Sequence, residues 1–447
     1  MPMPALAETA AVGCLLFILL IPLAAVGLAL INTGLGRSRS AAHLMMSSLC
    51  ALAVAALVYF GFGFAWQGFI GRGAHVLLLR GKEWNWIAAE PFFFRGLTLD
   101  TSLPSLASLQ QIFCVILACL IPLGSGADRW RLRAICCSTA ILAGITYPVF
   151  AHWVWGGGWL AQLGANYRVG YGFVDTAGSG VIQVVGGLSA LAVTWILGPR
   201  RGKYSEDGMA PAIPGHNGVL VLLGCLLALP GWFGLNAAGA MLFTGAEVGR
   251  AVLIAVNTLL CACAAALTAA VITGYRFGKP DASLSANGWV GGLVASSAGC
   301  AFVVPAEAVI IGSIAGGLVT LSVGWFELNL EVDDPGGAVS VHAVGGLWGL
   351  LAVGLFARFP SPVQNVASGF PGAASATASG QLLAQVVGVA TLLGFVLPLT
   401  YGLNLLLNRF CAFRVAVEGE RQGMDLYELG AGAYPEFVTH TDEFIPH

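Results

Sequence analysis

Two polar residues, Gln183 and His342, occupy matching places in a motif that occurs twice in an otherwise apolar chain. The copies begin at Asp175 and Asp334, 159 residues apart (334 minus 175), and align without gaps. Each has Asp, then Gly three residues later, the polar residue eight residues later, and then Val-Gly-Gly-Leu. An amide and an imidazole both donate and accept hydrogen bonds, so together they can bind a small polar molecule, but only imidazole titrates near neutral pH.

A structural interpretation competes with this functional one. An isolated His in an apolar helix is more often a hydrogen-bonded packing residue than a binding site. Polar groups inside a bilayer are costly, however, and tend to line pathways, and the symmetric placement of Gln183 and His342 favours function. Asp175 and Asp334 are interpreted as structural, because a carboxylate near a helix start satisfies free backbone N–H groups and suits the positive end of the helix dipole.

The composition places these residues in a membrane protein. Hydrophobic residues make up 57% of the 447 positions and charged residues 9%, against about 25% charged residues in soluble domains. A net charge of −2 argues against a nucleic-acid partner. The 11 cysteines lie in apolar settings without CxxC pairs or Cys/His clusters, so we expect no disulfide framework, no metal and no other cofactor.

Long apolar runs predict the elements that must position the pair. A bilayer-spanning helix needs about 20 apolar residues, and eleven runs meet this need at 9–33, 41–66, 104–124, 134–155, 177–198, 217–236, 250–274, 284–302, 306–328, 339–357 and 380–408. The stretch 357–380, rich in Pro, Ser, Gly and Ala, is expected to be a long exposed loop. We expect the first run to be a retained helix, because no basic residue precedes Arg37 as a secretory signal would require.

The repeated motif begins the fifth and tenth spans. Five spans separate the two copies, an odd number, so the two helices run in opposite directions across the membrane. This arrangement predicts an inverted repeat, helices 1–5 against helices 6–10 with an eleventh helix added. Such folds place their working site near the bilayer midplane between the repeats, where Gln183 and His342 would face each other.

Basic residues predict the orientation. The loops after odd-numbered spans and the tail hold 13 of the 20 Lys and Arg residues, and the opposite side holds 7. The positive-inside rule therefore predicts a multi-pass protein of the cell membrane, with the N-terminus outside and the C-terminus in the cytoplasm.

Several motifs resemble those of the ammonium transporter (Amt/Rh) family. They are Ala151-His-Trp-Val-Trp155-Gly-Gly-Gly158, the Asp175 and His342 motifs, Gly231-Trp-Phe-Gly-Leu-Asn-Ala237, Asp333-Asp-Pro335, and the tail from Glu420 to Tyr434. The resemblance covers nearly the whole chain in order. It implies eleven helices per subunit, a homotrimer in the lipid membrane, and a hydrophobic pore in each subunit.

The resemblance also implies roles for individual residues. Trp155, with Tyr147 and Gly239 around it, corresponds to an outer vestibule that attracts ammonium through the face of the Trp ring. Phe113 and Leu235 correspond to a pair of stacked Phe side chains that close the pore below the vestibule. Gln183 and His342 correspond to two hydrogen-bonded histidines in the lumen, and Trp232 to a supporting residue.

This chain departs from the family pattern at four of these places. Gln183 replaces the first histidine, Leu235 the second Phe, Gly239 a vestibule Ser, and Gly337 an Asp of the tenth-helix motif. If the protein transports ammonium as the resemblance implies, ammonium sheds a proton before it crosses the dry lumen, because a bare cation there is prohibitively costly. Gln cannot titrate, so a proton relay between two histidines is not available here.

Four functions remain open from the sequence. The first is transport of ammonium or ammonia down its gradient, and the second is an ammonium sensor that signals through the tail with little conduction. The third is a channel for another small neutral molecule. An enzyme is the least favoured, because no HExxH, paired-carboxylate or nucleophile motif occurs.

The chain divides into a membrane part, 1–408, and a polar tail, 409–447. The resemblance implies that the tail packs beneath the pore and binds a PII-type signal protein at the cytoplasmic face. The alternative is a strap that only stabilises the subunits, and both roles can hold together.

Overall fold

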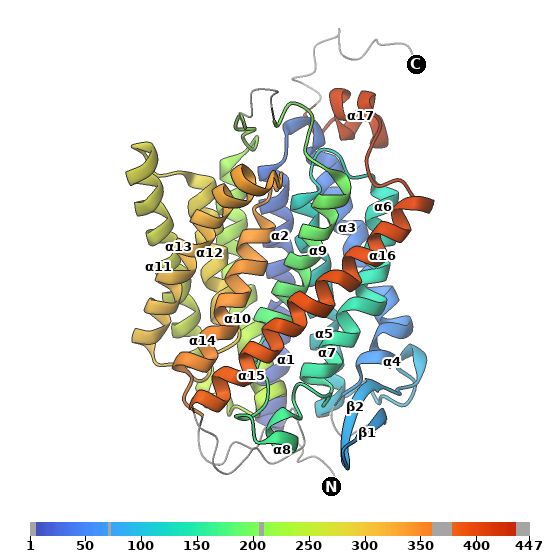
Figure 1. The fold of residues 1–447 in the computed structure, drawn as a ribbon, viewed down its shortest axis with the longest axis vertical. Coiled ribbons are helices and arrows are strands. Elements are labelled where there is room, and N and C mark those ends of the chain that lie inside the picture. The colour runs from blue at the N-terminus through green and yellow to red at the C-terminus, as the bar shows by residue number, and fades with distance from the viewer. Residues whose placement is uncertain (1–5, 70–72, 205–209, 360–377, 435–447) are drawn as a thin grey trace.

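The protein is described here from a computed structural model covering residues 6–69, 73–204, 210–359 and 378–434. Most of the expected loop 357–380 lies outside these residues. Figure 1 shows a bundle of long helices, with the start of α1 at one end and α17 at the other. Ten helical segments in the described ranges are long and apolar enough to cross a membrane. The expected eighth span is α12, whose 15 helical residues make it an eleventh, shorter crossing.

The first half contains spans one to five. Its helices are α1 (Glu8–Leu20), α2 (Pro22–Leu35), α3 (Ala41–Val58), α4 (Phe64–Gln67), α5 (Leu103–Ser125), α6 (Leu132–Ile141), α7 (Tyr147–Trp155), α8 (Leu163–Tyr167) and α9 (Val185–Leu197). Short 3-10 turns lie at Ser38–Ser40 (η1) and Phe92–Phe94 (η3). Single π-helical turns join helices at Tyr59–Gly63 (η2), Leu142–Thr146 (η4) and Ser179–Val184 (η5). Pro22 starts α2 and divides the first span.

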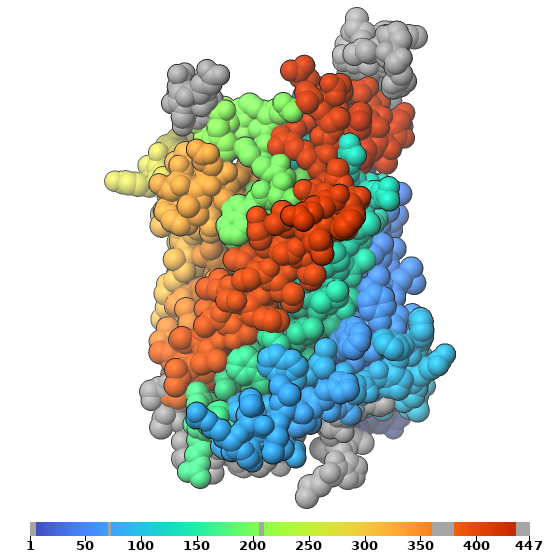
Figure 2. All heavy atoms as spheres, turned by 45° about the vertical axis from the view of Figure 1, so that its right-hand side comes forward, coloured from blue at the N-terminus to red at the C-terminus, as the bar shows by residue number. Residues whose placement is uncertain are grey.

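The second half repeats this plan in α10 (Gly218–Thr244), α11 (Ala251–Phe277), α12 (Ala282–Ser296), α13 (Pro305–Leu330) and α14 (Gly345–Phe356). A 3-10 turn at Val248–Arg250 (η6) precedes α11, and a π turn at Val339–Val344 (η7) precedes α14. The last crossing is α15 (Ala378–Thr391), η8 (Leu392–Val396) and α16 (Leu397–Phe410). Figures 1 and 2 show this crossing running diagonally over the outside of the bundle. The tail then forms α17 (Val417–Gln422) and η9 (Asp425–Leu429).

Glycines let the helices approach closely. A Cβ on Gly312 would lie 2.2 Å from the Cys261 carbonyl oxygen, and one on Gly316 would lie 2.2 Å from that of Ala265. The Gly-x-x-x-Gly spacing of α13 therefore lets the backbones of α11 and α13 pack directly against each other. Small residues commonly serve this purpose in membranes, where no hydrophobic force drives helix association.

A two-stranded antiparallel hairpin between the second and third spans was not predicted. It comprises β1 (Ala74–Leu79) and β2 (Lys82–Ala88), with a register shift between His75 and Val76. The Trp153 indole N–H donates to the Trp86 carbonyl at 2.8 Å, which ties the hairpin to α7. Figure 1 places it at the same end of the bundle as α8.

Candidate functional site

Gln183 and His342 lie side by side in the interior of the protein. Gln183 Oε1 is 2.7 Å from His342 Nδ1. Gln183 is fully buried and His342 retains 5% exposure. The two π turns that carry them, η5 and η7, contact each other and each other's following helices. The site is therefore located where the two repeats cross.

Close backbone approach makes this crossing possible. A Cβ on Gly187 would lie 2.4 Å from the Ala343 nitrogen, and one on Gly346 would lie 2.6 Å from the Ser179 carbonyl oxygen. Gly187 and Gly346 are the second glycines of the two Val-Gly-Gly-Leu sequences, so the shared motif brings the helices together at equivalent points.

The motif aspartates organise the two π turns. Asp175 accepts hydrogen bonds from the backbone N–H groups of Gly178, Gly180 and Val181 at 2.8–2.9 Å. Asp334 accepts from Val339 N–H at 2.7 Å and from the Ser125 hydroxyl at 2.7 Å. The equivalent glycines, Gly178 (φ 98°) and Gly337 (φ 64°), both have left-handed backbone conformations that favour glycine.

The pair presents one donor and one acceptor to a ligand in either assignment of its protons. If His342 Nδ1–H donates to Gln183, then His342 Nε2 accepts and the amide NH2 donates. If the amide is turned so that it donates to Nδ1, its oxygen accepts and Nε2–H donates. As placed, Gln183 Nε2 has no hydrogen-bond partner within the described part of the chain. Ammonia matches one donor and one acceptor, whereas ammonium has four donors and no acceptor.

The expected outer vestibule is closed. Trp155 is 1% exposed, and its ring is stacked on that of Phe243 with centroids 4.2 Å apart and planes 5° apart. The Trp155 indole N–H donates to the Asp175 carbonyl at 2.7 Å. Tyr147 is fully buried and packs edge-on against Tyr59, with centroids 6.3 Å apart.

Gly239 also lies in a filled position. A Cβ there would lie 2.9 Å from both the Ala177 Cβ and the Thr176 carbonyl oxygen. The backbone that leads into η5 therefore occupies the space that a vestibule Ser side chain would need.

Phe113 does not stand where the expectation of a pore gate requires it. It is half-buried and lines an outward-opening apolar groove of about 630 Å³ between α2 and α3, with residues that include Ile21, Met45 and Leu49. The expected gate at Phe113 is thus wrong. The adjacent Cys114, one residue further along α5, is the fully buried residue. Leu235 is fully buried, and the Gln110 amide donates to its carbonyl at 3.3 Å.

Trp232 supports α10, the helix that carries Leu235. It is fully buried, and its indole N–H donates to the Ser297 hydroxyl at 3.2 Å, which joins α10 to the end of α12.

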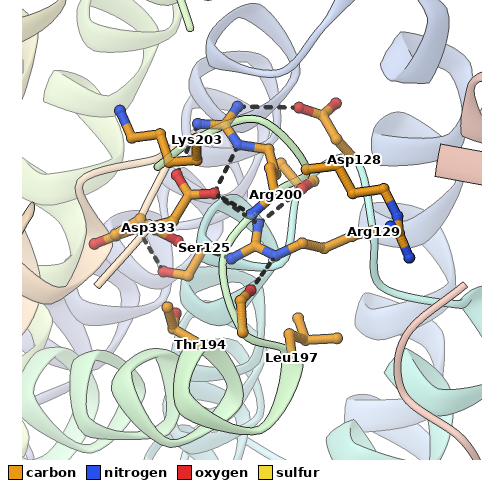
Figure 3. Close-up of polar contacts among 12 residues, drawn as sticks. Ser125, Asp128, Arg129, Thr194, Leu197, Arg200, Lys203 and Asp333 are labelled. Atoms are coloured by element: carbon orange, nitrogen blue, oxygen red, sulfur yellow. Dashed lines mark hydrogen bonds and ion pairs between the residues drawn. The ribbon is translucent and has the colours of Figure 1, made fainter. Parts of the chain in front are cut away.

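A buried cluster of charges lies where the loops that follow α5, α9 and α13 meet (Figure 3). Arg200 donates to both carboxylate oxygens of Asp333 at 2.9 Å and to Asp128 at 3.1 Å. Arg129, fully buried, donates to the carbonyls of Gly198 and Asp333 at 2.8 Å. The arginines hold the pKa of Asp333 at about 2 despite its burial, and burial lowers the pKa of Arg129 to about 10. Both groups are charged at neutral pH.

The tail docks onto this end of the molecule, and Figure 2 shows it in red at the top of the view. Arg131 N–H donates to the Phe413 carbonyl and Val415 N–H to the Arg129 carbonyl, both at 2.9 Å. Asp425 accepts from His43 N–H at 2.8 Å. Glu428 accepts from Leu132 N–H at 2.8 Å and lies 2.9 Å from His43 Nε2.

These features define the class of protein: a polytopic helical membrane protein built on an inverted repeat, with a buried polar pair where the repeats cross. A model of the Ammonium Transporter Family matches residues 12–434. The ammonium transporter Amt2 of Archaeoglobus fulgidus is 36% identical over 415 residues, 92% of this chain and 85% of that protein. The chain belongs to the ammonium transporter family.

Solved structures agree with this assignment. A structure titled "Sensor Amt Protein" aligns with a TM-score of 0.82 and 29% identity, covering 94% of this chain and 98% of that one. Mep2 from Candida albicans aligns with a TM-score of 0.79 over 97% of this chain and 92% of its own. At 24% identity, the Mep2 match shows a shared fold alone.

Two residues at this site were missed from the sequence, Phe243 and Cys114. The signal for Phe243 was available, because it lies four residues after Gly239 and eight after Leu235, on the same face of one helix. Cys114 could not be chosen over Phe113, because apolar residues surround both and a one-residue shift decides which faces inward.

Proposed function

We propose that the protein carries ammonium across the membrane, as neutral ammonia in the central section, through a pathway between the two repeats that passes Gln183 and His342. The 2.7 Å hydrogen bond between these two side chains carries the proposal. It leaves one donor and one acceptor for a ligand, which suits ammonia, and polar groups at membrane depth tend to line pathways.

Because Gln183 cannot titrate, the proton that ammonium releases does not pass along a pair of imidazoles. Either water and His342 carry it, or net charge movement is small. Transport in this protein is therefore expected to carry less charge for each ammonium than in a variant with two histidines.

The surrounding arrangement is proposed on similar grounds. The docked tail and the charge cluster lie on the side that holds 13 of the 20 basic residues, which supports a cytoplasmic C-terminus and an outer N-terminus in the cell membrane.

Exposed apolar side chains on α11 and α13, such as Val271 (70%) and Leu321 (50%), support contact with lipid and with neighbours in a homotrimer. The family resemblance supports a PII-type partner at the cytoplasmic face. We place the membrane part at 1–408 and the tail at 409–447, although α16 runs to Phe410.

The test is electrical. Purified protein in liposomes receives an ammonium pulse, and the Gln183→His variant is measured beside it. Currents in the parent protein that saturate with ammonium concentration support transport, and larger currents in Gln183→His support the role given to the amide. Silence in the parent together with tight ammonium binding by calorimetry would replace transport with an ammonium sensor. Silence with no binding would indicate another cargo.

A further inference from the structure

The parallel stack of Trp155 and Phe243 lies where α7 and α10 end. This is the end of the bundle opposite to the charge cluster. Both rings are 1% exposed, with centroids 4.2 Å apart. A face-to-face separation this small leaves no space for a cation between the rings. The Trp155 face that Phe243 covers is therefore unavailable for a cation–π contact in this state.

The two rings differ in how firmly they are held. The Trp155 indole N–H donates to the Asp175 carbonyl at 2.7 Å, and the Asp175 carboxylate is held by the start of η5. Phe243 has no polar anchor and lies one residue before the end of α10 at Thr244. Gly245 then turns the chain with φ 65° and is exposed. Phe243 is thus the less constrained of the two rings, since Trp155 has a hydrogen-bond anchor and Phe243 lies at the end of its helix.

Phe243 shares one face of α10 with Gly239 and Leu235, at spacings of four residues. Leu235 and Gly239 are the positions at which this chain lacks a gate Phe and a vestibule Ser. Phe113, the other expected gate residue, faces the outer groove. On this face of α10, Phe243 is the aromatic residue next to the helix end at Thr244, and its ring covers Trp155.

We infer that Phe243 is the outer gate of the pathway, and that a cation reaches the face of Trp155 only when the Phe243 ring moves off it; this inference rests on the transport proposed above. The gate keeps the entrance closed at rest, and ammonium competes with Phe243 for the Trp155 face. Occupancy of the Trp155 face by ammonium is therefore reduced at low ammonium concentration.

Tetramethylammonium tests this gate without depending on conduction, because it is a cation with no proton to lose and binds through aromatic faces. Its binding to purified protein is measured by calorimetry for the parent, for Phe243→Ala, and for Phe243→Leu in case the alanine variant folds poorly. Phe233→Ala is the matched control, since it removes the same ring from the same helix ten residues earlier, at a half-buried position.

The gate variants should bind tetramethylammonium at least about tenfold more tightly than the parent and the Phe233→Ala control. Adding Trp155→Leu to Phe243→Ala should abolish the gain. Equal binding by the parent and both gate variants, or a gain that survives Trp155→Leu, would overturn the inference.

Ammonium pulses on the same proteins separate this inference from the proposed transport. If the parent conducts, Phe243→Ala should reach half-maximal current at a lower ammonium concentration, and an unchanged value would contradict gating. If no variant conducts but tetramethylammonium binding follows the expected pattern, transport fails while Phe243 remains the cover of the Trp155 face.

Discussion

The amide of Gln183 determines which ligands the buried pair can hydrogen-bond, and it prevents the pair from relaying a proton between two titratable groups. Its oxygen pairs with His342 Nδ1 and its NH2 group is left without a partner in the described structure. An amide, like a neutral imidazole, has both a donor group and an acceptor group, but it never takes up a proton near neutral pH. In the proposed function, Gln183 therefore takes part in ligand binding without taking part in proton transfer, whereas two histidines would combine both roles.

Replacing Gln183 with Leu tests the binding half of this separation. The variant leaves His342 Nδ1 buried without a partner, so the free energy of unfolding should fall by about 0.5–2 kcal/mol, and ammonium binding should be lost. Thermal unfolding in detergent and calorimetry measure the two effects. Gln183→His, which can restore the hydrogen bond, is the control and should retain stability; equal binding by the Leu variant would contradict a role for the amide.

The elements around the pair show which parts of a fold can be predicted from sequence. The eleven crossings and their inverted order follow from long apolar runs and from one repeated motif, because both patterns act within the chain itself. The hairpin formed by β1 and β2 was missed, since Arg80, Lys82 and Glu83 give its turn the composition of a loop. The face of α5 was also misjudged at Phe113, because helix rotation depends on packing partners far away in the sequence.

At the starts of η5 and η7, the aspartates do more than an ordinary helix cap. Asp175→Ala removes three backbone hydrogen bonds in a fully enclosed site and should cost about 2–3 kcal/mol of unfolding free energy. Asp281→Ala, which removes a single 2.8 Å bond to Leu284 N–H at the start of α12, should cost about 1 kcal/mol and serves as the matched control. Thermal melts of the two variants compare them directly. Equal losses would show that the extra bonds of Asp175 add nothing.

The whole molecule is held together at the tail end by charges that come from distant parts of the chain. Asp128, Arg200 and Asp333 belong to three separate loops, and Arg414 of the tail reaches Glu420 and the Leu197 carbonyl at 2.8 Å. In the sequence, Arg200 and Arg414 entered only the count of basic residues for orientation, and Asp333 and Glu420 only the family motifs. Their pairing could not be predicted, because no periodic pattern links residues in loops that meet only after the helices assemble.

This cluster predicts a specific loss of stability in acid. The pKa of Asp333 is lowered to about 2, so its stabilising contribution is complete above its ordinary value near 3.8 and disappears as pH falls toward 2. Unfolding free energy in detergent should therefore drop across this window in the parent, and less steeply in Asp333→Asn, which starts from a lower value. The exposed Glu418→Gln variant should follow the parent. Parallel curves for the parent and Asp333→Asn would rule out this role.

Docking of the tail should depend on Glu428. His43 and the Leu132 N–H lower the pKa of this carboxyl from its ordinary value, so docking persists at neutral pH and weakens as pH falls below that value. Glu428→Gln should increase hydrogen exchange and proteolysis in the tail after Phe410, with less effect on the membrane helices. Glu418→Gln, with the same change of charge on an exposed side chain, should leave the tail protected; if both variants expose it equally, the specific contact is unimportant.

The backbone packed against Gly239 restricts the order in which this protein can acquire mutations. A serine introduced there alone would collide with Thr176 and Ala177, which belong to the same segment of backbone as Asp175. The substitution becomes tolerable only after that backbone segment has shifted, and such a shift would disturb the start of η5. A protein with this packing therefore cannot acquire a serine at this position in one step, either by natural mutation or by engineering.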